Sequence, residues 1–243
     1  HEMGLEVHPW FTVVLRWYPD SYPDLALPDV FEGKLGAFDV HNLVFQQFIT
    51  NLIEEVATNY DVDGINLDYI RAMGLCKSKQ CGQEYKLKYD RDLTMDSIAF
   101  SAIPAGVPTL IDYQAQAVTS LVKKISDAVR RVKPSIMISA DVHPELGNQP
   151  RFLVQGQRSI DWVNSGLVDV LFRMDYHRTI DVQATESVRS RLRNPDSVTQ
   201  LICNMSTDDE LAPGQKHFAR EGRWFADTIE MIQSRWPRTG VAV

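Results

Sequence analysis

The chain has 243 residues, of which 44% are hydrophobic and 23% are charged, and its formal net charge is −7. This composition excludes a disordered, collagen-like or disulfide-knotted chain. The acidic balance does not favour nucleic acid or an anionic membrane surface as a partner, because either would need clustered Lys and Arg.

Strand-like apolar runs alternate with helix-like segments along the chain. The expected strands are residues 4–15, 62–70, 135–142, 168–176, 197–203 and 240–243. The expected helices are residues 43–56, with Asp39 as N-cap, 118–129, ending before Pro134, and 218–232, ending before Pro237. The basic stretch at 123–133 has the pattern of the exposed face and last turn of the second helix. This alternation predicts a parallel sheet built of βαβ units.

The pattern inside the strands separates two parallel folds, a doubly wound sheet and a barrel. In residues 64–68 apolar positions alternate with Asn66 and Asp68, and the strands that lead to Asp141 and Asp175 show the same alternation. Period-two alternation sends one set of side chains to the helix layer and the other to a barrel interior. A doubly wound sheet would have near-continuous apolar runs instead. We therefore predict an α/β protein with a (β/α)₈ TIM barrel.

Polar side chains at the carboxyl ends of these strands form the candidate site, because barrel enzymes carry their chemistry there. Three are carboxylates, Asp68, Asp141 and Asp175. Neighbouring carboxylates push their pKa values apart, so that one acts as an acid while another stays ionised, as glycoside hydrolysis requires without a cofactor. Arg173 is the expected charge partner of Asp175. The candidate substrate-binding residues are His8, Trp10, Asn66, Tyr69, Arg71, Arg173, Tyr176 and His177.

Two segments, GLEVHPWF at residues 4–11 and YDVDGINLDYIR at 60–71, resemble the glycosyl-hydrolase-like 10 family. The resemblance continues in residues 161–170 and 174–176. It implies a bacterial TIM-barrel glycosidase with Asp68 as its leading catalytic carboxylate. It also implies that the first two strands precede His1, so that the single catalytic domain, residues 1–243, is truncated at both ends. We expect the substrate to be an oligo- or polysaccharide, from a bacterial polysaccharide or cell-wall glycan.

Residues 63–70 also resemble in part the chitinase signature DGxDxDxE. The third signature position is Asn66, and Ile70 stands where the chitinase acid would be. A substrate-assisted mechanism with a Glu at position 70 is therefore not expected.

Two other functions remain open. His8, Asp141, His143, Asp175 and His177 are metal-ligand types, and residues two apart on a strand share a face, so a metal-dependent hydrolase at the same strand ends is one alternative. A non-catalytic carbohydrate-binding barrel is the other. Metal analysis of the purified protein would identify the first, and sugar binding without turnover would favour the second.

Cys76 and Cys81 are expected to form a local disulfide at the mouth of the barrel, because zinc would need two more soft ligands and the sequence shows none nearby. With the family resemblance, this predicts a secreted, periplasmic or envelope-attached protein. Two reduced thiols in a cytoplasmic protein are the alternative. Cys203 is expected to be a buried free thiol within a strand. No apolar run approaches the roughly 20 residues that span a bilayer, so no transmembrane segment is expected in this chain.

Overall fold

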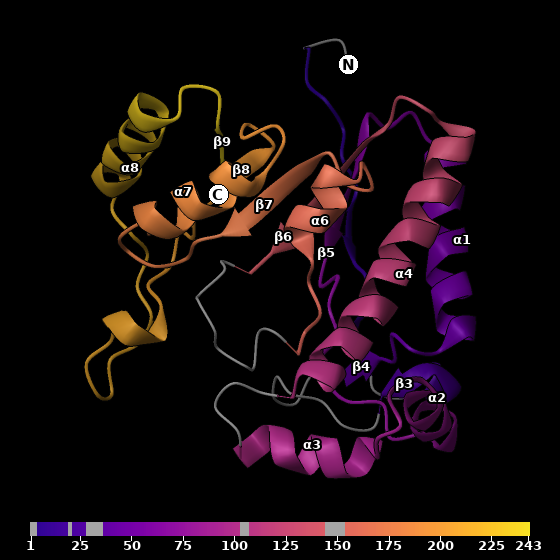
Figure 1. Ribbon diagram of the computed structural model, residues 1–243. Coiled ribbons are helices and arrows are strands. Elements are labelled where there is room, and N and C mark those ends of the chain that lie inside the picture. The colour runs from indigo at the N-terminus through magenta and orange to yellow at the C-terminus, as the bar shows by residue number, and fades with distance from the viewer. Residues whose placement is uncertain (1–3, 19–20, 28–35, 103–106, 144–153) are drawn as a thin grey trace. The chain divides into compact units, whose positions relative to one another are not determined.

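The computed structural model describes residues 4–18, 21–27, 36–102, 107–143 and 154–243 (Figure 1). The chain divides into two compact units. Unit 1 is His1–Ile138 with Leu146–Arg158, and unit 2 is Ser139–Glu145 with Ser159–Val243. Strand β6 (Met137–Val142) begins in unit 1 and continues in unit 2.

Unit 1 contains a parallel pair of strands and a small antiparallel sheet. Strand β1 (Trp10–Thr12) runs parallel to β5 (Gly64–Asp68), so that Thr12 lies opposite Asp68. The small sheet has the order β2-β4-β3. Its strands are β2 (Leu15–Arg16), β3 (Ala26–Leu27) and β4 (Gly36–Phe38), and the 3₁₀ helix η1 (Pro23–Leu25) precedes β3. The helices are α1 (Leu43–Asn59), α2 (Lys79–Tyr89), α3 (Leu93–Ala102) and α4 (Pro108–Val132).

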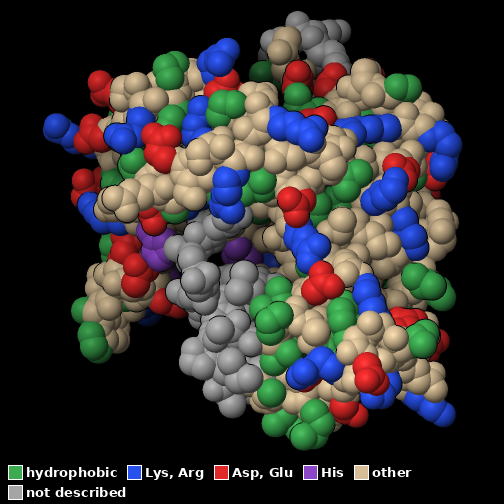
Figure 2. Space-filling model, viewed as in Figure 1, with side chains coloured by type: hydrophobic (Ala, Val, Ile, Leu, Met, Phe, Trp, Pro, Cys, Tyr) green, Lys and Arg blue, Asp and Glu red, His purple; other side chains and the backbone are tan. Residues whose placement is uncertain are grey.

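Helices α1 and α4 pack along each other in unit 1 (Figure 1). Helix α4 buries an apolar stripe at three- and four-residue spacing that includes Val118, Leu121, Val122 and Ile125. As the sequence predicted, Lys123 lies on the exposed side of this helix; it pairs there with Asp127 at 2.7 Å. On the face that Figure 2 displays, Lys and Arg side chains are interspersed with Asp and Glu.

The N-cap of α1 is Asn42 and not Asp39, which corrects the sequence prediction. Asn42 Oδ1 accepts the N–H groups of Val44 and Phe45, at 2.9 and 3.2 Å. The Asp39 carboxylate instead accepts the N–H of His41 at 2.9 Å. Asp39 therefore shapes the turn before the helix, and Asn42 satisfies the unpaired donors of its first turn.

Unit 2 contains four consecutive parallel strands among its described residues. They are β6 from Ser139 onward, β7 (Val170–Met174), β8 (Val198–Leu201) and β9 (Gly240–Ala242). The helices are α6 (Ser159–Asn164), α7 (Val182–Arg191) and α8 (Gly222–Arg235), with a 3₁₀ helix η2 (Asp208–Glu210). The predicted parallel α/β arrangement is confirmed for these strands and for the β1–β5 pair.

Residues 4–15 do not form one strand, as the sequence predicted. Only Trp10–Thr12 joins β5, because Pro9 has no N–H to donate to a ladder and contributes only its carbonyl, which accepts from Asn66. After Thr12 the chain leaves the parallel pair, and Leu15–Arg16 joins the antiparallel sheet.

Two predictions near the end of the chain are also wrong. Helix α8 begins at Gly222 and not at 218, because the Ser206 N–H donates to the Phe218 carbonyl and the Phe218 N–H donates to Ser206 Oγ, which holds this segment extended. Cys203 lies two residues beyond β8 and is partly exposed, so it is a free thiol but not a buried one in a strand. Among the described residues, no helix is long and apolar enough to cross a membrane.

Candidate active site

Asp68 is the last residue of β5, a strand whose five residues are all buried. The next residue, Tyr69, has a left-handed backbone with a φ of 50°, and its N–H donates to Asp68 Oδ1 at 2.6 Å. Burial raises the pKa of Asp68 above its ordinary value, and the Tyr69 N–H, the positive charge of Arg71 and the nearby Trp10 side chain reduce the rise. Asp68 therefore keeps its proton to a higher pH than an exposed aspartate.

Two exposed indole side chains lie near the Asp68 end of the β1–β5 pair. Trp10 is 60% exposed and Trp17 is 57% exposed. The Trp17 indole donates to Thr12 Oγ1 at 3.1 Å, which fixes one edge of the ring. An exposed indole that is held at its N–H edge has the form of a stacking platform for an apolar sugar face. Tyr69 is covered by the Arg71 guanidinium, 4.5 Å from the ring centroid, and Asn66 is buried in β5.

His8 does not lie at the strand end where the sequence prediction placed it. Its ring lies against Gly64, the first residue of β5, where an added Cβ would come within 2.2 Å of His8 Nδ1. Its Nε2 pairs with Glu6 at 3.0 Å. Four residues of extended strand separate Gly64 from Asp68, about 13 Å. The reason is the parallel register: Trp10 is level with Asn66, so His8 is level with the amino end of β5.

A buried ion pair follows β7 in unit 2. Arg173 Nη1 and Asp175 Oδ2 are 2.5 Å apart, and each side chain is 2% exposed. The Asp181 N–H also donates to Asp175 Oδ2, at 3.2 Å. Gln200, opposite Arg173 on β8, accepts from the same guanidinium at 3.5 Å. The predicted charge pairing of Arg173 with Asp175 is confirmed.

Asp141 occupies the adjacent strand of the same unit. It lies in β6 opposite Phe172 and is 7% exposed. Arg173 lies opposite the next residue, Val142. The carboxyl ends of β6 and β7 therefore carry Asp141, Arg173 and Asp175, but the register sets Asp141 level with Phe172 and not with Arg173, so the single shared face that period-two alternation predicted is not confirmed. Tyr176 follows with 37% exposure, and His177 pairs with Asp209 at 3.1 Å on the surface.

Arg220 is a residue of this region that sequence reasoning missed. Its buried guanidinium donates to the carbonyls of Cys203 at 2.8 Å and Tyr176 at 2.9 Å, and it forms an ion pair with Glu210. It also lies over the Trp224 ring, 4.5 Å from the centroid. Arg220 thus fastens together the segments that follow β7 and β8. No local pattern signals this role, because Tyr176 is 44 positions away in the sequence.

The ligand types of the metal-hydrolase alternative do not gather within unit 2. Among its described residues, Asp141, His143, Asp175 and His177 supply no three ligand atoms within 4.8 Å of one another. His177 is engaged with Asp209 instead, and residue 144, which follows His143, lies outside the described residues.

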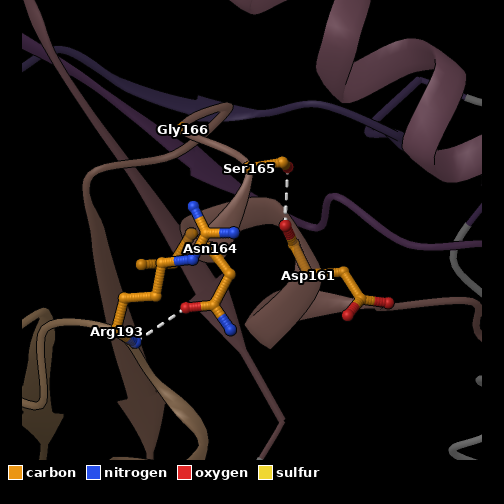
Figure 3. Close-up of a pocket in the computed structure, with 6 residues that line it drawn as sticks. Asp161, Asn164, Ser165, Gly166 and Arg193 are labelled. Atoms are coloured by element: carbon orange, nitrogen blue, oxygen red, sulfur yellow. Dashed lines mark hydrogen bonds between the residues drawn. The ribbon is translucent and has the colours of Figure 1, made fainter.

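A surface pocket of about 700 Å³ in unit 2 lies away from these carboxylates (Figure 3). It is lined by Asp161, Asn164 and Arg193, among others, which precede β7 and β8 in the sequence. Asn164 Oδ1 accepts the Arg193 N–H at 2.8 Å, and its amide donates to the carbonyl of Arg191 at 2.9 Å. The pocket is therefore at the amino ends of the strands, opposite to Asp175, and its polar groups hold the connecting turns.

A match to the family described as glycosyl hydrolase-like 10 covers residues 40–207, a segment that contains Asp68, Asp141 and Asp175. The chain belongs to the glycosyl hydrolase-like 10 family. The resemblance inferred from the sequence motifs is confirmed. None of the curated proteins is similar enough in sequence to count as a relative of this glycosyl hydrolase-like 10 chain.

Solved structures of glycoside hydrolases share the fold of this glycosyl hydrolase-like 10 protein. The PgaB (BpsB) glycoside hydrolase domain from Bordetella bronchiseptica matches with a TM-score of 0.70 and 12% identity, over 99% of this chain and 70% of that one. A β-galactosidase from Rahnella sp. R3 matches with a TM-score of 0.61 and 13% identity, over 100% of this chain and 40% of that one. A catalytic mutant of Gan42B, a GH42 β-galactosidase from G. stearothermophilus, matches with a TM-score of 0.60 and 13% identity, over 95% and 40%. The chain therefore has the parallel α/β architecture of TIM-barrel glycoside hydrolases and spans two fifths of the length of the two galactosidases.

Proposed function

We propose that this protein is the catalytic domain of a glycoside hydrolase with a closed (β/α)₈ barrel, and that it cleaves a bacterial polysaccharide or cell-wall glycan. The observation that carries the proposal is the environment of Asp68. A buried carboxyl group with a raised pKa stands at the carboxyl end of a parallel strand, beside exposed indole rings. Membership of the glycosyl hydrolase-like 10 family supports the same reaction class.

Asp68 is the proposed general acid. Glycoside cleavage needs a proton on the leaving oxygen, and a carboxyl group delivers it best when its pKa lies near the working pH. Burial moves the pKa of Asp68 in that direction. The Tyr69 N–H donates to the carboxyl group and thereby fixes its orientation.

The second carboxylate is proposed to be Asp141 or Asp175, which attacks the anomeric carbon or activates water. Both are buried at the carboxyl ends of strands in unit 2, and Arg173 fixes one oxygen of Asp175. The proposed sugar-binding residues form two groups. They are Trp10, Asn66, Tyr69 and Arg71 beside Asp68, and Tyr176 and His177 after β7. His8 is not among them, because the structure places it at the other end of β5.

The proposed location is secreted, periplasmic or envelope-attached. The Cys76–Cys81 disulfide, which the structure contains, supports this, since such bonds persist in oxidising compartments.

The proposal is tested by turnover of bacterial polysaccharides and cell-wall glycans, measured as new reducing ends. Asp68→Asn should lower kcat by at least about 100-fold, the usual contribution of a general acid. Asp61→Asn is the matched control, because its carboxylate is 84% exposed. Near-normal turnover by Asp68→Asn on a glycan that the wild type cleaves would remove Asp68 from the mechanism. Loss of wild-type turnover after chelation would favour a metal-dependent hydrolase, and sugar binding without turnover would favour a binding module.

A further inference from the structure

A cavity of about 560 Å³ lies in unit 1, separate from the polar groups around Asp68. It is lined on one side by the turn before α1, with Asp39, His41 and Asn42, and on the other by Cys76 and Cys81. The two sulfur atoms and a carboxylate oxygen of Asp39 all lie within 4.8 Å of one another. No sequence spacing reveals this group, because Asp39 comes from a segment 37 positions before Cys76.

We propose that Asp39, Cys76 and Cys81 form a zinc site that exists only when the disulfide is reduced. Two thiolates and one carboxylate are ligands that Zn²⁺ accepts in a tetrahedral site, with a fourth position left to water. In the disulfide, both sulfur atoms are bonded to each other and cannot act as thiolate ligands. The oxidation state of this pair therefore decides whether the site is present.

The reduction requires an external dithiol. The dithiol gives two electrons and two protons to the Cys76–Cys81 bond, which becomes two thiols, and the dithiol is itself oxidised to a disulfide. Binding of Zn²⁺ then displaces the two thiol protons into solution, because the metal binds thiolates.

Local contacts favour thiolates at this place and keep the ligands near one another. Cys81 lies in the first turn of α2, an 11-residue helix, and a helix N-terminus stabilises a thiolate. Ser78 Oγ accepts the Cys81 N–H at 3.1 Å and lies 3.2 Å from Cys76 Sγ. The Asp39 carboxylate is fixed by the His41 N–H. These hydrogen bonds do not depend on the sulfur–sulfur bond, so the three side chains stay in the same cavity after reduction.

The test compares oxidised and reduced protein with Co²⁺ and Zn²⁺ as probes. The protein is reduced with an excess of a dithiol, freed of the dithiol under anaerobic conditions and titrated with Co²⁺. The reduced protein should show a thiolate-to-cobalt charge-transfer band that one equivalent of Zn²⁺ removes, and the oxidised protein should show none. Cys203→Ser should behave as the wild type. Asp39→Asn should keep the thiols but weaken Zn²⁺ binding by about tenfold or more.

Four results would overturn the proposal. Equal Co²⁺ spectra of oxidised and reduced protein would do so, as would an Asp39→Asn variant with the affinity of the wild type. The third is a reduced protein that binds no metal while its circular dichroism remains native. If reduction unfolds the protein, Zn²⁺ must restore the native dichroism spectrum in the wild type and not in the Cys76→Ser/Cys81→Ser variant, and failure to do so also rejects the site.

Discussion

At the scale of single residues, the buried carboxyl groups of Asp68 and Asp175 have opposite electrostatic surroundings. Asp68 accepts a hydrogen bond from a backbone N–H, and burial still raises its pKa. Asp175 is held by a guanidinium within the interior of unit 2. Ionised Asp68 is therefore unfavourable to the fold, whereas ionised Asp175 and Arg173 depend on each other.

The raised pKa of Asp68 gives its carboxyl group a pH-dependent effect on stability. The folded protein holds this proton more tightly than the unfolded chain, so its contribution to stability is present at low pH and is lost as the pH rises from the unfolded to the folded pKa. Asn at position 68 cannot ionise, so the Asp68→Asn variant avoids this loss of stability at high pH. Its amide oxygen still accepts the Tyr69 N–H. We expect its melting temperature at pH 7 to equal or exceed that of the wild type, measured by thermal unfolding across pH, with Asp61→Asn unchanged. A lower melting temperature at pH 7 would contradict this expectation.

The Arg173–Asp175 pair should be sensitive to loss of either member. Arg173→Met leaves the buried Asp175 carboxylate without its ion-pair partner, and loss of one member of a buried pair costs about 3–5 kcal/mol of unfolding free energy. The double variant Arg173→Met/Asp175→Leu should recover part of that loss, because neither position of the pair then carries a buried charge. Urea unfolding of the three proteins measures both effects. A double variant that is no more stable than the single one would show that the pair is held for reasons other than charge.

At the scale of elements, the sequence predicted regular periodic structure better than contacts between distant segments. The strands around Asp68, Asp141 and Asp175 were predicted because alternation of apolar and polar residues is local. The strands of the β2-β4-β3 sheet have two or three residues and carry no such pattern. His8 was misplaced for a related reason, because composition reveals a strand but not which end of its neighbour each residue faces.

Arg220 should control the order of the segments that it joins. Replacing it with Met removes both hydrogen bonds to carbonyls and the ion pair with Glu210. Faster hydrogen exchange is expected in residues 203–210 and 176–178, together with a KM for the glycan that rises more than kcat falls. Arg223→Met is the matched control, because Arg223 lies in the same chain segment and its side chain is 87% exposed. Unchanged exchange in Arg220→Met would show that other contacts hold these segments.

The Cys76–Cys81 bond closes a short loop and should have a local effect. The chain-entropy model gives about 2 kcal/mol for a loop of this length, so global folding should survive Cys76→Ser. We expect faster exchange in residues 72–83 and a raised KM, with a modest fall in melting temperature. Thiol titration of the unfolded, unreduced wild type should find one thiol, that of Cys203. Three thiols would reject both the bond and the exported location proposed from it.

At the scale of the whole molecule, the family and the parallel α/β architecture were accessible from the sequence, because both rest on contiguous segments. The ligand group of Asp39 with the two cysteines and the role of Arg220 were not accessible, since each joins side chains from segments that are distant in the chain. Even the confirmed Arg173–Asp175 pair was predictable only because its members lie two positions apart on one strand.

Tyr69 illustrates how such a fold constrains its own evolution. A non-glycine residue with a φ of 50° is strained by roughly 1 kcal/mol or more. Replacement of Tyr69 by Gly would relieve this backbone strain. The same exchange would remove the ring that lies under Arg71, although the N–H that holds Asp68 would remain. Selection for stability and selection for the aromatic ring that lies under Arg71 therefore act in opposite directions at this one position.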